Sequence, residues 1–447
     1  MSNSAHILIL GAGIAGLATA YHLAVKHNLK DIVVVDEREP LGLTSSRGTM
    51  AYRNLFPGPG DAMVRLLNRS IDLLQEIDVA TKHAIQLSQN GYMYFTAREA
   101  QIEKWRELAR DAEQRGVGKF RETTSGPITH AGAVDGIDLL TNPDLIHQHY
   151  PRVTRDVVAM LHVRRCGAFD VFALGEWLVS QARTHGVKFL RDRVEKISVR
   201  GNRIESVHGA SGAEISTDTL ILAAGPLLPD IARMLGIKLP VYNELHAKMT
   251  MRDSARVFPR YADLLLWNDP QELEWSETER SEFTAADATR WLLAAFPGGV
   301  HFLPKGTPED PKIMGLWTYD MRPSKFQAEP MFDTRAAEII LRGLARMIPE
   351  ARVYFGRGRE AFVDGGSYCK TRENRPLIGP LPIQGAYICG ALSGFGVMAS
   401  QGAAELVSAH VVGAALPAYA RWFLLSRYQD AEYRALLANW DARSGQL

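Results

Sequence analysis

Three glycines with the spacing of a phosphate-binding turn lie near the start of the sequence. They are Gly11, Gly13 and Gly16, and they directly follow the apolar run of residues 6–10. In a strand–turn–helix unit the first glycine allows a tight turn, the second lets a pyrophosphate approach the backbone, and the third lets the helix pack on the strand. Asp36 ends the next apolar run, where its carboxylate can accept hydrogen bonds from both hydroxyls of a ribose. The spacing predicts a site for an ADP-containing cofactor.

Composition and cysteine usage exclude several other classes of protein. The cysteines Cys166, Cys369 and Cys389 form no C-x-x-C pair and no metal-ligand spacing, so we expect reduced thiols, no metal site and a cytoplasmic location. The net charge of +1 gives no field that would favour nucleic acid or an acidic membrane. No apolar run approaches the length of about 18 residues that a transmembrane helix needs. A length of 447 residues suits two domains.

The elements that must position these residues follow from hydrophobic periodicity. An amphipathic helix is expected over residues 61–78 and a charged surface helix over 99–115, with a strand over 91–95 between them. A further helix is expected over 174–185, where Gly186 ends it. Four more strands are expected over 187–190, 194–199, 203–207 and 219–223. The turn between the middle two strands makes them part of a β-meander.

Over nearly its full length the sequence resembles the flavin-dependent amine oxidoreductases of the D-amino-acid oxidase superfamily. The most similar branch is the sarcosine, dimethylglycine and glycine oxidase group. Besides the glycine turn and Asp36, the matching segments are 44–48, 167–170, 186–189 with Val194, 223–226, 371–379 and 390–398. The resemblance implies an α/β fold (mixed α+β), in which a Rossmann-type FAD-binding domain is combined with a discontinuous antiparallel-sheet substrate domain.

The last of these segments is the most specific part of the resemblance. In the family this glycine-rich loop wraps the pyrimidine side of the flavin ring and leads into a long helix, here expected over 399–412. A helix N-terminus offers N–H donors and a positive dipole end to the negative charge of a reduced flavin. Gly394 and Gly396 let the backbone lie against the ring without Cβ clashes. Because no second glycine turn is present for a nicotinamide cofactor, we expect FAD and not NAD. A glycine-rich loop that ends an ordinary αβ unit is the alternative.

The resemblance assigns FAD contacts along much of the chain. They are Gly11, Gly13, Ile14, Ala15, Gly16, Asp36, Glu37, Arg38, Thr44, Ser45, Ser46, Arg47, Val194, Ala224, Gly225, Gly366, Gly394, Phe395, Gly396, Val397 and Met398. Some members of the family attach the flavin through a cysteine. Cys369 falls a few residues after that position, so we expect non-covalent FAD.

The chemistry that the resemblance implies is hydride transfer from the α-carbon of a neutral amine to the flavin, followed by hydrolysis of the imine. It needs positioning and an anion clamp for the substrate carboxylate, for which Arg53 and Arg47 are candidates. A surface salt bridge is the alternative for either arginine. Lys312 is the candidate for oxygen activation, with a solvent-facing strand lysine as the alternative. His246 is expected to border the flavin or to be a packed histidine.

These residues together predict an enzyme that oxidises the C–N bond of an amino acid or N-alkyl amine, with oxygen as acceptor and hydrogen peroxide as product. Two alternatives stay open: a dehydrogenase that passes electrons to a quinone or a partner protein, and a flavin-bound assembly factor without turnover. The expected FAD-binding domain takes residues 1–78, 150–235 and 355–412, the substrate domain takes 79–149 and 236–354, and a helical tail over 413–447 packs on the body.

Overall fold

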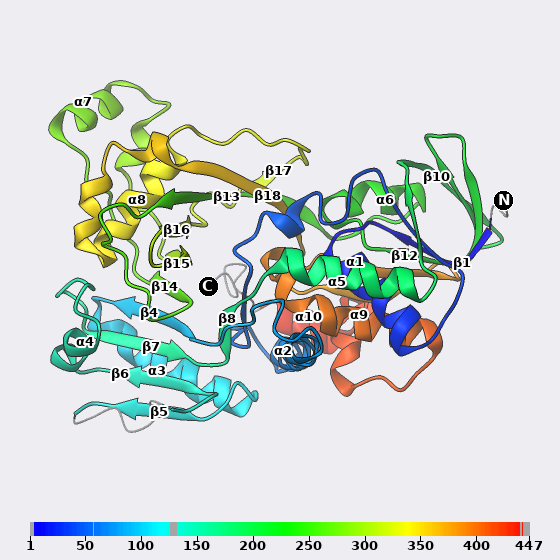
Figure 1. The fold of residues 1–447 in the computed structure, drawn as a ribbon, viewed down its shortest axis with the longest axis horizontal. Helices are drawn as coiled ribbons and strands as arrows, with labels where there is room; N and C mark the ends of the chain where they lie inside the picture. Colours follow the sequence, from blue (N-terminus) through cyan, green and yellow to red (C-terminus); the bar gives the residue numbers. More distant parts are fainter. Residues whose placement is uncertain (1–3, 57, 126–131, 439, 441–447) are drawn as a thin grey trace.

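The computed structural model describes residues 4–56, 58–125, 132–438 and 440. Within these ranges the strands form an eight-stranded sheet, a ten-stranded sheet and the short pair of β3 (Ala51–Arg53) and β8 (Cys166–Ala168). Figure 1 shows the eight-stranded sheet at the end of the molecule that carries the N-terminus and most of the ten-stranded sheet at the opposite end. The two-sheet architecture is the one expected from the sequence.

The eight-stranded sheet has a parallel centre that is buried on both faces. Its strands, in spatial order, are β10 (Val194–Arg200), β11 (Arg203–Gly209), β12 (Glu214–Leu222), β1 (Ser4–Leu10), β2 (Ile32–Asp36) and β9 (Lys188–Arg191), with β20 (Ala386–Gly390) on β12 and β19 (Leu377–Pro380) on β20. On β1, Ile7 and Ile9 pack in one core and Leu8 and Leu10 in another. This two-sided burial explains why β1 is a continuous apolar run.

Helices cover this sheet and connect its strands. The helix α1 (Ile14–Tyr21) joins β1 to β2, and α5 (Val171–Thr184) leads into β9. The helix α9 (Gly396–Val412) follows β20 and packs against α1 and α2 (Ala62–Ala80). The helices expected over residues 61–78 and 174–185 are therefore present, with ends shifted by a few residues.

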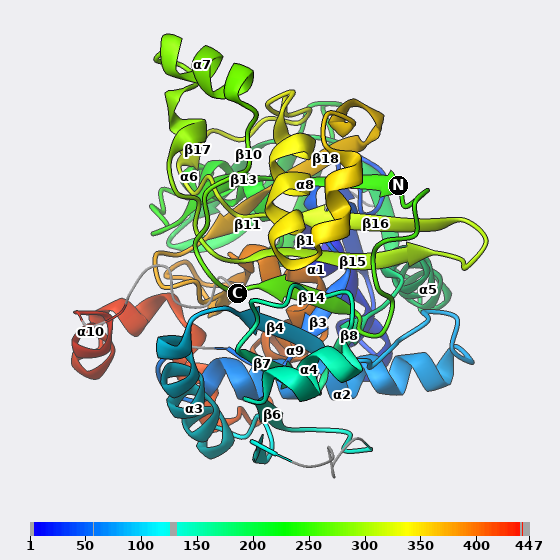
Figure 2. The ribbon, with the colours of Figure 1, turned by 90° about the vertical axis from the view of Figure 1, so that its left-hand side faces the viewer.

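The ten-stranded sheet is mostly antiparallel. Its strands, in spatial order, are β17 (Pro323–Ser324), β13 (Tyr242–Arg252), β16 (Pro311–Leu316), β15 (Val300–Gly306), β14 (Leu264–Trp267), β4 (Tyr92–Thr96), β7 (Ala159–Val163), β6 (Ile137–Leu140) and β5 (Phe120–Thr123), with β18 (Phe362–Lys370) on β13. The pairs β14–β4 and β5–β6 are parallel. The helices α3 (Glu99–Gln114) and α8 (Ala336–Met347) also belong to this end, as Figure 2 shows.

Two strands belong to a different sheet from the one that the expected domain limits imply. β7 and β18 lie in segments expected in the FAD-binding domain, yet both pair within the ten-stranded sheet. The chain therefore crosses between the two sheets within segments 150–235 and 355–412. The division into domains stays a prediction.

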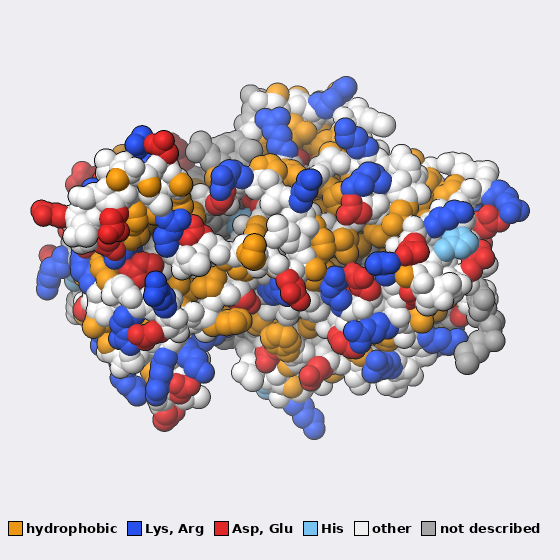
Figure 3. Space-filling view, turned by 90° about the horizontal axis from the view of Figure 1, so that it is seen from above, with side chains coloured by type: hydrophobic (Ala, Val, Ile, Leu, Met, Phe, Trp, Pro, Cys, Tyr) orange, Lys and Arg blue, Asp and Glu red, His pale blue; other side chains and the backbone are white. Residues whose placement is uncertain are grey.

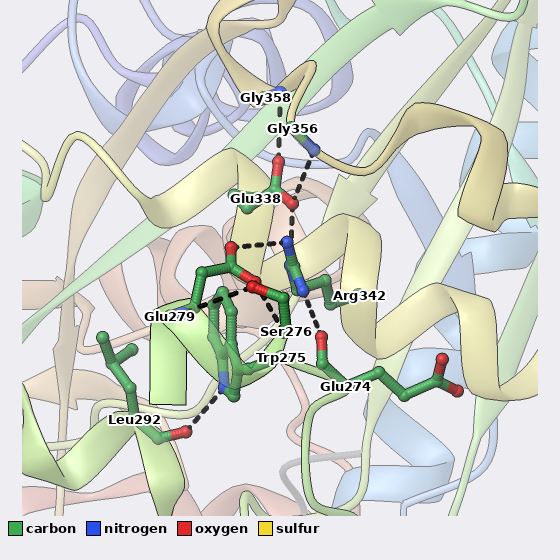
Figure 4. Close-up of polar contacts among 9 residues, drawn as sticks. All are labelled: Glu274, Trp275, Ser276, Glu279, Leu292, Glu338, Arg342, Gly356 and Gly358. Carbon is green, nitrogen blue, oxygen red and sulfur yellow. Dashed lines mark hydrogen bonds and ion pairs between the residues drawn. The ribbon is translucent and has the colours of Figure 1, made fainter. Parts of the chain in front are cut away.

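A buried arginine anchors the chain segment that leads from the ten-stranded sheet through α7 (Glu277–Ala285). As Figure 4 shows, the Arg342 guanidinium of α8 binds Glu279 at 2.8 Å and Glu338 at 2.7 Å. Its centre also lies 4.2 Å from the ring centroid of Trp275. These contacts hold the chain that continues to residues 297–299, which line a cavity described below.

The described part of the C-terminal tail packs on the body through a second buried ion pair. Arg427 binds Glu373 at 2.6 Å, and both side chains are almost fully buried. The hydroxyls of Tyr428 and Tyr433 also donate to Glu373, at 2.7 and 2.9 Å. Residues 441–447 lie outside the described ranges. In the part of the chain that the structure describes, no helix is long and apolar enough to cross a membrane.

Candidate functional site

The glycine turn lies between β1 and α1, as the spacing predicts. Gly11 has a φ of +112°, and a Cβ there would overlap the carbonyl oxygen of Ala223. A Cβ on Gly16 would overlap the carbonyl oxygen of Gly11, because α1 packs directly on the turn. Gly13, the N-cap of α1, provides no side-chain cap, and the N–H of Ile14 donates to the Ser45 hydroxyl at 3.0 Å, so the other N–H groups of the first helical turn are left for an anion.

Asp36 ends β2 beside this turn. Its carboxylate accepts hydrogen bonds from the backbone N–H groups of Ala12 at 2.8 Å and Arg38 at 2.9 Å. A carboxylate has about four lone-pair positions, so acceptor capacity remains for hydroxyl groups of a ligand. Asp36 also lines the main cleft, which is the position that binding of a ribose requires.

The main cleft runs across the carboxyl ends of the parallel strands and holds about 1480 Å³ of space not filled by protein, its open mouth included. Most of the expected FAD contacts line it: Gly11, Gly13, Ile14, Ala15, Asp36, Glu37, Arg38, Thr44, Ser45, Val194, Ala224, Gly225, Gly394, Gly396 and Val397. Ligand sites at this edge are usual in open α/β sheets. Figure 3 shows acidic and basic side chains mixed over one face of the molecule.

The remaining residues that were expected to contact FAD do not line the main cleft. Gly16 packs the turn, Ser46 donates to the carbonyl oxygen of Leu43 at 2.9 Å, and Arg47 reaches the carbonyl oxygen of Ala328 at 3.4 Å. Gly366 packs against Thr44. Phe395 and Met398 line the second cavity described below. These residues support the cleft or adjoin it, and their contact with FAD stays a prediction.

The loop before α9 has the features of a site for the polar edge of a flavin. Ala391 and Ser393 have φ values of +52° and +54°, which are strained for residues with a side chain. The Ser393 hydroxyl is buried with no hydrogen-bond partner and lines the cleft, although its residue type and position did not mark it as a candidate. The helix α9 begins at Gly396 without a side-chain cap. The cleft therefore offers unsatisfied donors where the carbonyls of a flavin would need them.

A second cavity adjoins the cleft and shares Tyr368 and Gly394 with it. It holds about 1090 Å³ of space, again with its opening included. The residues that line it are Thr49, Ala51, Arg53, Tyr92, His246, Leu264, Pro297, Gly298, Gly299, His301, Leu316, Thr318, Met321, Tyr368, Lys370, Asn374, Gly394, Phe395 and Met398. Two of these described lining residues are cations, and none is an aspartate or glutamate. Because Lys370 is paired with Glu244 behind the wall, Arg53 is the lining cation that favours a ligand with an anionic group.

Arg53 lies in the wall of this cavity, as expected for the anion clamp. It ends β3 and is 3 % exposed. Its guanidinium centre is 5.7 Å from the ring centroid of Phe395, and Nη1 lies 3.5 Å from the Tyr94 hydroxyl. Arg47, the other candidate, lines neither cavity. The structure thus brings only the first of the two arginines to the site.

His246 also lies in the cavity wall, on β13. Its ring stacks on Tyr368 with 4.6 Å between centroids, and its nitrogens face Glu244 and Thr318. A second histidine, His301, is hydrogen-bonded through Nδ1 to the carbonyl oxygen of Gly299 at 2.9 Å. Burial lowers the pKa of His301 to about 4, so this imidazole is neutral at neutral pH.

Lys312 is not brought to either cavity, and this corrects the expectation that it stands over the flavin. Its ammonium group lies 3.0 Å from Asp310, and its side chain is 46 % exposed. On β16 it is Leu316, four residues further along, that lines the second cavity. At about 3.3 Å per residue, Lys312 lies about 13 Å away along the strand. It is the solvent-facing strand lysine of the alternative interpretation.

Cys369 lines the main cleft but is poorly suited to react. Its thiol is buried, and burial raises its pKa to about 12. The thiolate is the nucleophilic form of cysteine, so this thiol is unreactive at neutral pH. Cys166 and Cys389 are buried as well. The geometry supports non-covalent FAD, which stays a prediction.

Comparison with known proteins identifies relatives of the whole chain. The family described as FAD dependent oxidoreductase matches residues 6–410. The mitochondrial dimethylglycine dehydrogenase of Homo sapiens is 21 % identical over 409 residues, which cover 90 % of this chain and 42 % of that protein. A D-amino acid dehydrogenase of Rhizorhabdus wittichii is 25 % identical over 280 residues, which cover 53 % of this chain and 65 % of that protein. This chain therefore spans less than two thirds of either relative.

Solved structures share the fold. L-proline dehydrogenase from P. horikoshii superposes with a TM-score of 0.71 at 19 % identity, covering 96 % of this chain and 99 % of that one. Glycine oxidase from Geobacillus kaustophilus superposes with a TM-score of 0.70 at 15 % identity, covering 94 % of this chain and 98 % of that one. These likenesses confirm the predicted fold class, and the family match confirms FAD as the cofactor.

Proposed function

The chain belongs to the family of FAD-dependent oxidoreductases, and from this premise we propose that it oxidises the C–N bond of an amino acid or an N-alkyl amino acid. The observation that carries the proposal is Arg53, a buried cation in a cavity that adjoins the FAD cleft. A guanidinium binds a carboxylate through paired, charge-assisted hydrogen bonds. Because the two cavities share Tyr368 and Gly394, an amino acid held by its carboxylate at Arg53 would lie beside the FAD cleft.

FAD, when bound, supplies the two-electron acceptor for this oxidation. The chain would hold the cofactor at three places: the first turn of α1 would bind the pyrophosphate, Asp36 the ribose, and the first turn of α9 the flavin. The apolar side chains Leu264, Leu316 and Met398 line the second cavity and reduce its water content. Fewer waters strengthen the attraction between Arg53 and a carboxylate.

Anaerobic reduction of the bound flavin tests this proposal. The purified holoprotein is mixed under argon with a panel of D- and L-amino acids, N-methyl amino acids and cyclic amino acids, and the loss of visible flavin absorbance is followed. We expect bleaching by at least one compound that carries both an amine and a carboxylate, and much slower bleaching by its descarboxy analogue. If no compound of the panel bleaches the flavin, the proposal fails and the flavin-bound assembly factor is favoured.

The electron acceptor has two candidates. Oxygen, with hydrogen peroxide as product, is the acceptor expected from the resemblance, but Lys312, on which that expectation rested, lies away from both cavities. A quinone or partner protein is the second candidate, and the curated relatives named above are called dehydrogenases. Peroxide yield in air separates the two: one peroxide per substrate consumed supports oxygen, and slow reoxidation with rapid reduction of an artificial dye supports the dehydrogenase.

A further inference from the structure

Three polar side chains that line the second cavity, His246, Thr318 and Lys370, belong to a buried series completed by Glu244, which does not itself line the cavity. Glu244 and His246 lie on β13, Lys370 ends β18, and Thr318 follows β16. The carboxylate oxygen Oε2 of Glu244 lies 3.0 Å from Nε2 of His246 and 3.1 Å from Nζ of Lys370. On the other side of the ring, Nδ1 of His246 lies 3.2 Å from the Thr318 hydroxyl.

The strand geometry explains this arrangement. Residues two apart on a strand point to the same face, so Glu244 and His246 share one face of β13. β13 pairs in antiparallel register with β18, where Tyr242 lies opposite Lys370 and Glu244 opposite Tyr368. Glu244 and Lys370 are each 2 % exposed, and His246 is 6 % exposed. Charged groups buried this deeply are costly unless they are paired, which points to a purpose beyond packing.

The hydrogen-bond partners of His246 indicate which of its ring nitrogens carries the proton. Burial raises the pKa of the Glu244 carboxyl, but the hydrogen bond from His246 and the charge of Lys370 outweigh burial and leave that pKa below its usual value. Glu244 is therefore a carboxylate at neutral pH and accepts from the Nε2–H of His246. The other nitrogen, Nδ1, is then free of a proton and accepts from the hydroxyl of Thr318.

Other charged side chains around His246 form ion pairs with residues of opposite charge. Lys248, the next residue on the same face of β13, binds Asp364 of β18 at 2.7 Å. Asp320 binds Arg322 at 2.6 Å. Tyr368, stacked on the His246 ring, has its pKa raised to about 12 by burial and by the charge of Asp364, so it is un-ionised at neutral pH. Asp320 also interacts electrostatically with His246, whereas Glu244 is hydrogen-bonded to the ring and therefore assigns the proton to Nε2.

We propose that Thr318 and His246 accept the proton that the ammonium group of the substrate must lose before oxidation, and that Glu244 and Lys370 position them. This inference rests on the proposed function. One N–H bond of the ammonium breaks and its proton goes to the Thr318 oxygen, while the Thr318 hydroxyl proton passes to Nδ1 of His246. No electrons are transferred in this step. It leaves a neutral amine, whose lone pair the subsequent oxidation requires, and an imidazolium stabilised by Glu244.

The pH dependence of anaerobic flavin reduction tests the proposal. If His246 takes up this proton, kcat/KM for reduction of the wild-type holoprotein should rise with pH along an acid limb. We expect His246→Asn to abolish this limb and to slow reduction at neutral pH by about 10²-fold, the lower value typical of a lost general base. Glu244→Gln removes the carboxylate that stabilises the imidazolium, so the pH profile of reduction should also change in this variant.

A matched control and a second measurement distinguish this role from a structural one. Lys248→Met removes a buried, paired lysine from the same strand outside the cavity, and its acid limb should match that of the wild type. An unchanged limb in His246→Asn and Glu244→Gln, with FAD content equal to the wild type, overturns the proposal.

¹⁵N NMR of histidine-labelled protein tests the arrangement even if no amine reduces the flavin and the proposed function fails. The signals of His246 are identified by their loss in His246→Asn. A neutral His246 protonated at Nε2, and altered in Glu244→Gln, supports the assigned series. Protonation at Nδ1 overturns it.

Discussion

Replacement of Arg53 by methionine tests the anion clamp. The substitution keeps an unbranched apolar side chain but removes the guanidinium. Truncating one partner of a buried, hydrogen-bonded charge pair typically costs about 2–4 kcal/mol when the other charge is left unpaired. Arg53 is 3 % exposed, so water would not replace it readily. At about 1.4 kcal/mol per tenfold, kcat/KM for an amino acid should fall by about 30- to 700-fold.

The assay is stopped-flow reduction of the flavin under argon, with Arg47→Met as the matched control. Arg47 lies upstream in the same segment and lines neither cavity, so in protein saturated with FAD its replacement should leave kcat/KM nearly unchanged. A weak amine substrate without a carboxylate should lose little rate in Arg53→Met, because it never contacted the guanidinium. Equal losses for the amino acid and the amine would refute the clamp and make Arg53 a packing residue.

Three further predictions concern the cofactor, the acceptor and the tail. Asp36→Ala should weaken FAD binding by about 1–3 kcal/mol, measured by titration of the apoprotein, whereas Cys369→Ser should keep FAD that acid still releases. Lys312→Met should leave flavin reoxidation in air unchanged, and a tenfold slowing would restore its expected role. Burial raises the pKa of Glu373, but Arg427 and its other partners outweigh burial and hold the pKa below its usual value. Ionised Glu373 therefore stabilises the folded protein fully above about pH 4.3, which is the pKa of a glutamate in the unfolded chain. This stabilisation is lost as pH falls through the lower pKa that Glu373 has in the folded protein. Glu373→Gln should lower Tm at pH 7, with a free-energy cost of about 3–5 kcal/mol, and the difference from wild type should shrink in acid.

The cofactor cleft could be predicted because its key residues are local in sequence. The glycine turn, α1 and Asp36 form one continuous strand–turn–helix–strand unit, and the spacing alone fixes their geometry. The glycine-rich loop and α9 are similarly contiguous. Ser393 in that loop could not be predicted as a site residue. Its candidacy comes from a strained φ and a buried hydroxyl, and residue type indicates neither.

The second cavity could be predicted only in part, because it is assembled from distant segments. Glu244 and Lys370 are 126 residues apart and meet only through the pairing of β13 with β18. Lys312 shows the converse difficulty. Lys312 shares one face of β16 with the cavity-lining Leu316, but it lies four residues away along the strand, where its side chain reaches solvent and Asp310.

Product analysis of a single anaerobic turnover tests the central claim most directly. Holoprotein in excess over the best amino acid of the panel is held under argon, and the carbonyl product, the released ammonia or amine, and the reduced flavin are measured together. Oxidation of a C–N bond predicts one carbonyl compound and one ammonia or amine for each flavin reduced, with the carboxylate carried into the product. Reduced flavin without these products, or carbon dioxide released from the carboxylate in their place, would contradict the account.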